Sequence, residues 1–595
     1  MHDASSEHDL TPEQRIARLE SELAAARSEL KDARSTIDRL RDRYRQVLEQ
    51  LQLMRRRLFV AQAERVDTNA DQLAFDKMFA EAQALEKALD AAEGSGAAPK
   101  GDKPDGRKKR KTPPTGRRDL SKIPLPIERV ELLDPELEGH AERIGFEESQ
   151  RVAHRRGGAV RLVLARAVYK VASDATTSTR NDSSPSEAAD ATEKTTDGAR
   201  IVVTPLPKEL FRRGMLAPSM VAHLLVAKYV MGLPFHRLEQ RFAFEGFPLD
   251  RGTMCRYAED AGATLGAIVE AARKDALSRA FCLSTDATGV SIQPTPLDDG
   301  KRQPCRKGHF FVTLADRDHV FFDFQAKHDS LAVWEMFKGF SGHIQADAHA
   351  VYNALFRGTP PKGAKSDDED ENDATRGPPP TEVGCWSHAR RKFWEATVCK
   401  HKLGLEGLRK IDEIFAKDRE LAELPPSRRK ERRDAVVRPL VDAFFAWVAT
   451  EKKHVTARGL VNTALGYAAR QEEPLRRFLD DGRLRLENNA AERALRPIAV
   501  GRKNWLFFGS DDHASAAANL FSLVASCKLH GLDPEAYLAE VIRVMPYWPR
   551  ERYIELAPIR WARTRDRLDA EEMKLPLGHV TVPPPLAAEE QSASR

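Results

Sequence analysis

A heptad repeat near the start of the chain constrains the fold most strongly. Apolar residues recur at alternating spacings of three and four over six heptads, from Ile16 to Leu58, and no proline interrupts the repeat after Pro12. The intervening positions are mainly Arg, Glu, Asp and Gln, as the solvent-facing side of paired helices requires. The pattern predicts a coiled coil over residues 11–65 that joins copies of the chain, with an intramolecular helical hairpin as the alternative.

Composition shifts divide the rest of the 595 residues, because a chain of this length is too long for one hydrophobic core. Residues 66–119 predict a helix followed by a basic, disordered linker, and residues 120–172 predict a small mixed unit with strand-like runs. A polar, unpatterned stretch predicts a second disordered linker at 173–200. A helical segment is predicted at 201–275 and a mixed α/β domain at 276–510. A C-terminal helical domain at 511–550 and a tail at 551–595 follow.

The composition also predicts a soluble protein of a reducing, cytoplasmic compartment. No apolar run approaches the roughly eighteen residues that a membrane span requires, and the first ten residues lack the pattern of a secretory signal. The six cysteines form no CxxC pair, which argues against a disulfide framework and against a cysteine zinc site. We therefore expect free thiols and no membrane association.

Short helices separated by Gly and Pro are predicted across residues 201–275. Two of them fit a helix-turn-helix around a turn at Gly246 and Pro248. In that arrangement Arg251 and Arg256 would face the major groove of DNA. An ordinary helical bundle with surface arginines is an equally good interpretation of the same pattern.

Strand-like runs replace the helical pattern between residues 281 and 394. Three successive strands are followed by alternation of strand and helix, which is typical of a ribonuclease H-like mixed sheet flanked by helices. A hydrophilic, proline-bracketed loop at 360–382 interrupts this pattern, and residues 400–470 predict a helical insertion. The predicted fold class is therefore multidomain α+β with a ribonuclease H-like core.

Two aspartates follow short apolar runs in this region. Asp286 lies in FCLSTDATGV and Asp347 lies in GHIQADAHAVYNAL, and each run is of the kind that forms a buried strand. Acids at strand ends that converge with a third acid suggest two-metal phosphoryl transfer. The simpler interpretation is that each aspartate caps a turn or a helix.

A third carboxylate lies in DGRLRLENNAAERALRPIAVGRKNWLFFGS, residues 481–510. Glu492 lies there among asparagines and basic residues, a mixture suited to holding a divalent metal and a phosphodiester together. If Asn488 caps a helix, Glu492 shares one helical face with Arg496, whereas Glu487 precedes the helix. We prefer Glu492 to Glu487 as the third acid, and a helical ion pair with Arg496 is the alternative role.

Several of these segments together resemble one known family. GCWSHARRKFWEA, the stretch from residue 481 to 512, CKLHGLDPEAYL and the Asp347 segment are similar to transposases of the insertion sequence 66 family. The likeness extends from RRRLF at 55–59 to about residue 545. It implies the large transposase of a bacterial insertion sequence, with a coiled coil, a helical DNA-binding region, a DDE catalytic domain and a short C-terminal domain.

By this resemblance Asp286, Asp347 and Glu492 are the catalytic and metal-binding triad. Two Mg²⁺ ions, or Mn²⁺ in their place, would support cleavage of the element ends and attack of the freed 3′ hydroxyl on target DNA. The implied partners are the terminal inverted repeats, target DNA, further copies of the chain and accessory proteins of the same element, at the bacterial nucleoid. The residues expected to contact DNA are Arg251, Arg256, His388, Arg390, Arg391, Arg493, Arg496, Arg502 and Lys503.

Two features depart from the family pattern. Family members usually carry cysteine pairs before the helical region, but residues 133–172 contain no cysteine, so we expect no zinc there. The first acid usually belongs to an Asp-Glu-Thr triplet, which here reads Asp286-Ala287-Thr288. The altered triplet leaves two alternative functions open: a catalytically silent DNA-binding or regulatory relative, and a ribonuclease H-like nuclease without strand transfer.

Overall fold

The computed structural model describes Arg27, Lys31 and residues 125–155, 158–172, 194–196, 199–211, 214–294, 303–364, 377–398, 401–455 and 458–586. Apart from Arg27 and Lys31, which are helical, the coiled coil predicted at 11–65 lies outside the described residues. The predicted linker at 66–119 and most of those at 173–200 and 360–382 lie outside them as well. The chain divides into two compact units, of which the larger contains most of residues 118–387 and 471–595.

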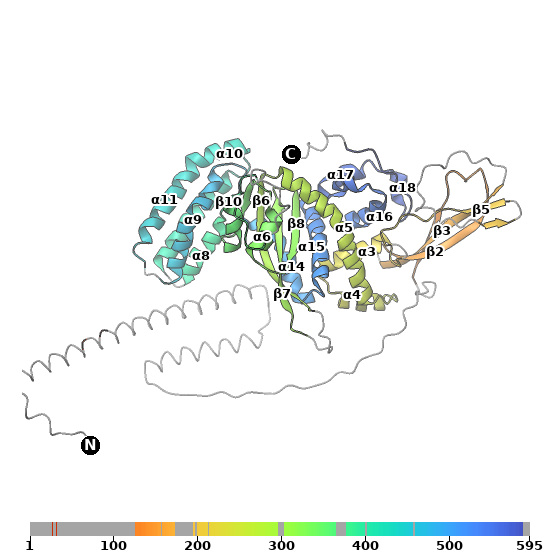
Figure 1. The fold of residues 1–595 in the computed structure, drawn as a ribbon, viewed down its shortest axis with the longest axis horizontal. Coiled ribbons are helices and arrows are strands. Elements are labelled where there is room, and N and C mark those ends of the chain that lie inside the picture. Colours follow the sequence, from red (N-terminus) through yellow and green to blue (C-terminus); the bar gives the residue numbers. More distant parts are fainter. Residues whose placement is uncertain are drawn as a thin grey trace, which may run out of the picture. The chain divides into compact units, whose positions relative to one another are not determined.

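The first described elements of the larger unit form a five-stranded sheet (Figure 1). Its strands are β1 (Ile127–Leu132), β2 (Glu142–Arg155), β3 (Gly158–Ala172), β4 (Lys194–Thr196) and β5 (Ala199–Val203). Strand β3 is its central strand, because β1, β2 and β5 all pair with it, and the middle of β3 is buried on both faces, as its nearly continuous apolar run requires. The sheet extends into the range predicted as a linker, because β5 pairs with β3 and β4 pairs with β5.

Three helices follow this sheet: α3 (Pro218–Tyr229), α4 (Phe235–Phe244) and α5 (Arg251–Arg279). Helix α3 is buried on nearly every side, consistent with its apolar sequence. Asp250 caps α5 by accepting a hydrogen bond from the backbone N–H of Gly252. With 29 residues, α5 extends over about 44 Å, which is much longer than the short helix predicted here.

The second sheet of the larger unit carries the two aspartates. Its strands are β6 (Cys282–Ile292), β7 (Arg306–Ala315), β8 (His319–Gln325), β9 (His343–Gln345) and β10 (Thr381–Val383). Their spatial order is β10-β9-β6-β7-β8. The neighbours β6, β7 and β8 are antiparallel, whereas β9 is parallel to both β6 and β10.

Helices from the end of the chain follow this sheet. Helix α14 (Asn489–Trp505) packs on β6 and β7, and α15 (Asp511–Leu529) packs on β8. Helix α16 (Pro534–Val544) packs on α3 and α15, and α17 (Pro558–Arg565) packs on α15. Helix α15 lies along the edge strand β8, where the hydroxyls of Ser522 and Ser526 accept hydrogen bonds from backbone N–H groups of the strand. This contact satisfies donors that an open sheet edge would otherwise expose.

The smaller unit is helical, and all but one of the helices named here lie within the predicted insertion at 400–470, the exception being α8, which precedes it. It contains most of α8 (Trp386–Val398), α9 (Lys402–Glu420), α11 (Arg438–Glu451) and α12 (Leu460–Arg470). Phe393, Phe444 and Trp447 pack together at its centre.

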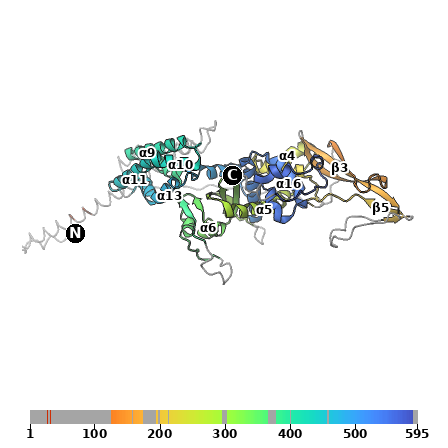
Figure 2. The same ribbon diagram turned by 90° about the horizontal axis from the view of Figure 1, so that it is seen from above.

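Shorter helices complete the described chain. They are α6 (Ser330–Phe337), η2 (Ala350–Tyr352), α7 (Asn353–Phe356), α10 (Pro426–Arg432), η4 (Arg433–Val437), α13 (Glu472–Arg476), η5 (Arg477–Leu479), η6 (Met545–Tyr547), η7 (Arg550–Leu556) and α18 (Ala570–Lys574). Figure 2 shows the larger unit from a second direction, in which β3 and β5 again extend beyond α16.

Two expectations about composition can be compared with the described residues. None of the helices in this part of the chain combines the length and the apolar character that a bilayer-spanning segment needs. The cysteines within it are free thiols, as expected: Cys255, Cys282, Cys305, Cys385 and Cys527.

Candidate active site

Asp286 lies within β6, and Asp347 lies two residues beyond the end of the neighbouring parallel strand β9. Strands β6 and β9 pair through Ser284 and Gln345, and each aspartate follows its paired residue by two positions. Neighbouring strands are about 4.8 Å apart, and residues two positions apart point to the same face. The register therefore directs both carboxylates to one region beyond the end of β9.

Tyr352 provides a second indication that the two carboxylates converge. This residue is 2% exposed and lies on η2, directly after the Asp347 segment. Burial raises the pKa of the Tyr352 hydroxyl, and the negative charges of Asp347 and Asp286 raise it further. Both carboxylates are therefore close enough to act on the same phenol.

Helix α14 begins beside Asp286. Asn488 occupies the N-cap position, but its side chain does not cap the helix as its type predicts. Instead its Nδ2 donates a 2.7 Å hydrogen bond to the backbone oxygen of Thr285, and its backbone N–H donates to Sγ of Cys385. Glu492 follows in the first turn, so the tether brings the third carboxylate toward the end of the sheet that carries Asp286.

Glu487 is placed differently from Glu492. It precedes α14, as predicted, and its Oε2 accepts a 3.0 Å hydrogen bond from the hydroxyl of Ser387. The helical position of Glu492 and the engagement of Glu487 with Ser387 both favour Glu492 as the third acid.

The other end of α14 is also fastened to β6. Nη1 of Arg502 donates to the hydroxyl of Thr288 at 3.1 Å and to the backbone oxygen of Gly289 at 2.6 Å. Arg502 was expected to contact DNA, but the structure engages its guanidinium within the fold. Hydrogen bonds at both ends therefore hold α14 along the strand that bears Asp286.

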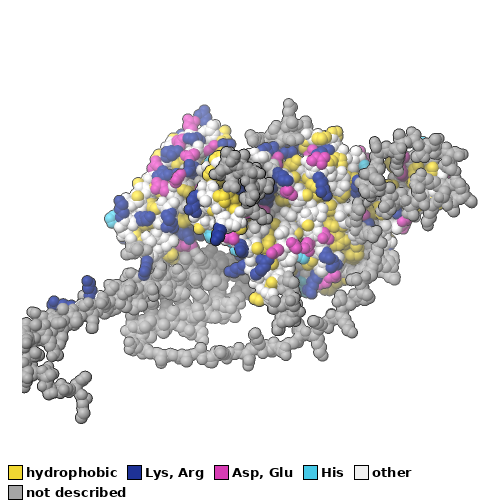
Figure 3. All heavy atoms as spheres, viewed as in Figure 1, with side chains coloured by type: hydrophobic (Ala, Val, Ile, Leu, Met, Phe, Trp, Pro, Cys, Tyr) yellow, Lys and Arg dark blue, Asp and Glu magenta, His cyan; other side chains and the backbone are white. Residues whose placement is uncertain are grey.

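The exposed basic residues of α14 share one helical face. Arg493, Arg496 and Lys503 are exposed and lie at spacings of three and seven, which places them on the same side of the helix. Figure 3 shows that Lys and Arg side chains alternate with Asp and Glu over the face in view, without one large positive area. The average charge of this face therefore does not indicate where DNA would bind.

The basic residues of α8 are described within the smaller unit. Arg390 forms an ion pair with Asp412 on α9, in which Nε lies 2.6 Å and Nη2 lies 3.3 Å from the carboxylate oxygens. Arg391 is exposed and His388 is half-buried. Arg390 thus connects two helices of its own unit, a role that a local sequence pattern does not reveal.

Arg251 and Arg256 are exposed at the start of α5. The backbone N–H of Arg251 donates to Glu239 of α4, and Nη2 of Arg256 donates to the hydroxyl of Thr253. The two helices are joined through a turn in which Gly246 has φ of 77°, a conformation that favours glycine. Both guanidinium groups remain at the surface of the predicted helix-turn-helix.

Three histidines near Asp347 were not predicted as part of the site. The rings of His309 and His328 are 5.2 Å apart and those of His328 and His349 are 4.7 Å apart, measured between centroids. Burial lowers the pKa of His328, and the neighbouring His349 and His309 lower it further. They come from β7, the segment after β8 and the segment after β9, so no short motif could have identified them.

Comparison with known families assigns the chain to a family of transposases. The model of the transposase IS66 family matches residues 213–516, which include the second sheet and α14, and the model of the IS66 C-terminal element matches residues 522–559. The chain therefore belongs to the IS66 transposase family.

Three relatives from Sinorhizobium fredii (strain NBRC 101917 / NGR234) are similar to it. The uncharacterized protein y4hP is 29% identical over 393 residues, which cover 62% of this chain and 66% of that protein. The uncharacterized protein y4qI is 25% identical, covering 59% and 64%, and the uncharacterized protein y4jD is 26% identical, covering 58% and 65%. The chain thus spans slightly less than two thirds of the length of each relative.

Proposed function

We propose that the chain is a DDE-type DNA transposase that cleaves the ends of an insertion sequence and transfers the freed 3′ hydroxyl to target DNA. The observation that carries the proposal is the arrangement of Asp286 on β6 and Asp347 just beyond the end of the neighbouring parallel strand β9, with Glu492 on a helix fastened beside Asp286. Membership of the IS66 transposase family supplies the class of substrate.

A ribonuclease H-like core is part of this proposal. Three antiparallel strands in sequence, β6, β7 and β8, are followed by β9 and β10, which lie in parallel on the other side of β6. This order supports the fold predicted from the alternation of strands and helices. Its first and fourth strands are those associated with Asp286 and Asp347.

The donor set fits a hard divalent cation. Asp286, Asp347 and Glu492 offer only carboxylate oxygens, the ligands that Mg²⁺ prefers and that Mn²⁺ accepts. These three residues would hold two such ions, which when bound stabilise charge on the entering and leaving oxygens of the phosphodiester.

The surrounding residues would position the acids and the DNA. Asn488 and Arg502 hold α14 against β6, and the exposed Arg493, Arg496 and Lys503 would bind phosphates next to it. His388 and Arg391 on α8, and Arg251 and Arg256 on α5, remain proposed DNA contacts. Further copies of the chain, joined through residues 11–65, and accessory proteins of the same element remain proposed partners.

Tyr352 would support the acids without acting as a nucleophile. The side chain is 2% exposed, so its phenol can donate a hydrogen bond within the fold but is not open to an incoming phosphodiester. Chemistry without a covalent enzyme intermediate is consistent with such a site.

The proposal can be tested with the full-length protein and labelled duplexes that carry an element end. In Mg²⁺ we expect cleavage followed by joined products, and we expect Asp347→Asn and Glu492→Gln to abolish both while DNA binding is retained. Glu487→Gln is the matched control on the same segment and should keep the wild-type rate within about threefold. Normal turnover by Asp347→Asn would contradict the assignment.

The same assay separates the alternative functions. Specific binding of the element end without cleavage would indicate a catalytically silent relative, which the altered Asp286-Ala287-Thr288 triplet leaves open. Cleavage without joined products would indicate a nuclease.

A further inference from the structure

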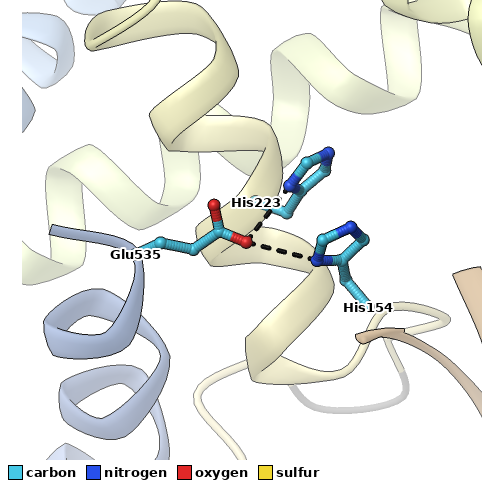
Figure 4. A group of neighbouring side chains, drawn as sticks. All are labelled: His154, His223 and Glu535. Carbon is cyan, nitrogen blue, oxygen red and sulfur yellow. Dashed lines mark hydrogen bonds and ion pairs between the residues drawn. The ribbon is translucent and has the colours of Figure 1, made fainter. Parts of the chain in front are cut away.

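A second cluster of metal-ligand side chains lies where the N-terminal sheet meets the C-terminal helices. Figure 4 shows His154 from β2, His223 from α3 and Glu535 from α16 pointing toward one another. Nδ1 of His154 lies 3.2 Å and Nδ1 of His223 lies 3.1 Å from the same oxygen, Oε1 of Glu535. The three potential ligand atoms lie within 4.8 Å of one another.

Backbone contacts hold the three elements in place around this cluster. The N–H of His154 donates to the hydroxyl of Ser219 in the first turn of α3, and Val152 exchanges backbone hydrogen bonds with Met215 and Ala217. Glu535 lies in the first turn of α16, where its N–H donates to Asp533. All three side chains therefore project from fixed secondary structure, which is the arrangement that a preorganised site requires.

The donor types and their spacing fit a transition metal of the zinc class. Zinc takes imidazole nitrogen and carboxylate oxygen at about 2.0–2.2 Å in tetrahedral geometry, which places neighbouring ligand atoms about 3.3–3.5 Å apart. The observed nitrogen-to-oxygen distances of 3.1 and 3.2 Å are close to that spacing. Two nitrogens with one oxygen also differ from the all-oxygen set that magnesium prefers.

The two histidines present Nδ1 to the same carboxylate. Their rings stack with centroids 3.7 Å apart, and Nδ1 of each ring lies 3.1 to 3.2 Å from Oε1 of Glu535. An ion bound beside Glu535 would therefore have both imidazole nitrogens within reach.

His223 supplies an independent observation. Its side chain is nine-tenths buried, and its Nδ1 is the ring nitrogen that faces Glu535. Burial of an imidazole is unfavourable unless its polar atoms form strong interactions. A metal bond at Nδ1 would compensate for this burial better than one carboxylate oxygen shared with His154.

We propose that His154, His223 and Glu535 bind one zinc-class metal ion that joins the N-terminal sheet to α3 and to the IS66 C-terminal element. The side chains of His154 and Glu535 are 17% and 30% exposed, so the fourth coordination position is open to water. The ion has a structural role, because the three ligands come from three elements whose packing it would fix. The site uses none of the residues proposed for catalysis. His154 lies within residues 133–172, where we expected no zinc because the stretch contains no cysteine, and the proposed site differs in that it uses histidine and glutamate ligands.

The experiment uses full-length protein that has been freed of metal with chelator and then titrated with Co²⁺ and Zn²⁺. We expect one tightly bound equivalent with the visible absorption of four-coordinate Co²⁺, displaced by Zn²⁺ and retained in excess Mg²⁺. The same equivalent should persist in Asp347→Asn, which separates this site from the catalytic carboxylates.

Matched variants assign the ligands. His154→Gln and Glu535→Gln should weaken binding by at least about 100-fold. His236→Gln, at an exposed histidine of α4, and Glu540→Gln, on the same helix as Glu535, should bind as the wild type does. Unchanged affinity in both cluster variants would overturn the proposal.

X-ray absorption of the wild-type protein with one equivalent of Zn²⁺ provides a test that needs no variant. We expect a shell of nitrogen and oxygen with imidazole scattering. A sulfur shell, or no bound equivalent at all, would show that the cluster is a hydrogen-bonded contact only.

Discussion

Replacement of Asn488 by alanine tests whether the start of α14 positions the third acid. The side chain is buried at 1% exposure, and its Nδ2 donates a 2.7 Å hydrogen bond to the Thr285 backbone oxygen, next to Asp286. Removing a buried donor and leaving its acceptor without that bond costs about 1–3 kcal/mol of unfolding free energy. A domain with a stability of about 5–15 kcal/mol stays folded after such a loss.

The expected effect on catalysis is similar in free energy to the effect on folding, because a 100-fold loss of rate corresponds to about 2.7 kcal/mol. A displacement of about 1 Å in a reacting group costs about 100-fold in rate, and α14 loses the contact that holds its first turn against β6. We therefore expect Asn488→Ala to cleave DNA about 100-fold more slowly at a temperature where it is fully folded. Single-turnover cleavage with excess protein measures the rate, and urea unfolding measures the free energy.

Asn504→Ala is the matched control, because Asn504 lies on the same helix and its Nδ2 also donates to a backbone oxygen, that of Gly232, at 3.2 Å. This contact is exposed, so the control should lose less than about 1 kcal/mol and keep its cleavage rate. A folded Asn488→Ala variant that cleaves as fast as the wild type would refute the idea that this tether positions Glu492.

Three further predictions concern charge and packing. Arg502→Ala should lower the unfolding free energy by about 1.5–3 kcal/mol and leave the salt dependence of DNA binding unchanged. Lys503→Ala should instead reduce the slope of log K against log salt by about 1. Binding isotherms at several salt concentrations compare the two variants. Burial lowers the pKa of Lys228 to about 8, so the folded protein loses this proton at a lower pH than the unfolded chain does. The unfolding free energy of the wild type should therefore rise by about 1–3 kcal/mol from pH 8 to about 10.5, relative to Lys228→Met. Urea unfolding across this range measures the difference, and an equal pH dependence in the two proteins would contradict the lowered pKa. Gly262→Ala would place Cβ 2.3 Å from a backbone oxygen of α15, so it should destabilise the protein by about 1–3 kcal/mol, whereas Gly145→Ala, which has open space around it, should change stability by less than about 0.5 kcal/mol in thermal melts.

Local patterns predicted the elements on which the three acids lie. The apolar runs before Asp286 and Asp347 correspond to β6 and β9, and the position of Asn488 before Glu492 corresponds to the start of α14. These features depend on alternation and on the ends of helices, which neighbouring residues determine. Membership of the transposase family was also evident from contiguous segments, and the family models agree with it.

The tertiary structure decides which basic side chains are exposed and which form hydrogen bonds or ion pairs within the fold. Arg502 and Lys503 are adjacent in sequence, but the first donates to β6 and the second is exposed. Arg390 and Arg391 differ in the same way, because only the side of α8 that faces α9 brings Arg390 to Asp412. A run of cations therefore does not indicate which members remain available for phosphate.

By itself, the sequence determined the resemblance to the family, the order of the elements and the identity of three candidate acids, because these are recorded in short contiguous stretches. Only the folded chain decided that β4 and β5 complete the first sheet, that Asn488 bonds to Thr285 and that His154 and His223 meet Glu535. Strand pairing and side-chain clusters join residues separated by tens to hundreds of positions, and the packing that brings them together leaves no periodic signal along the chain.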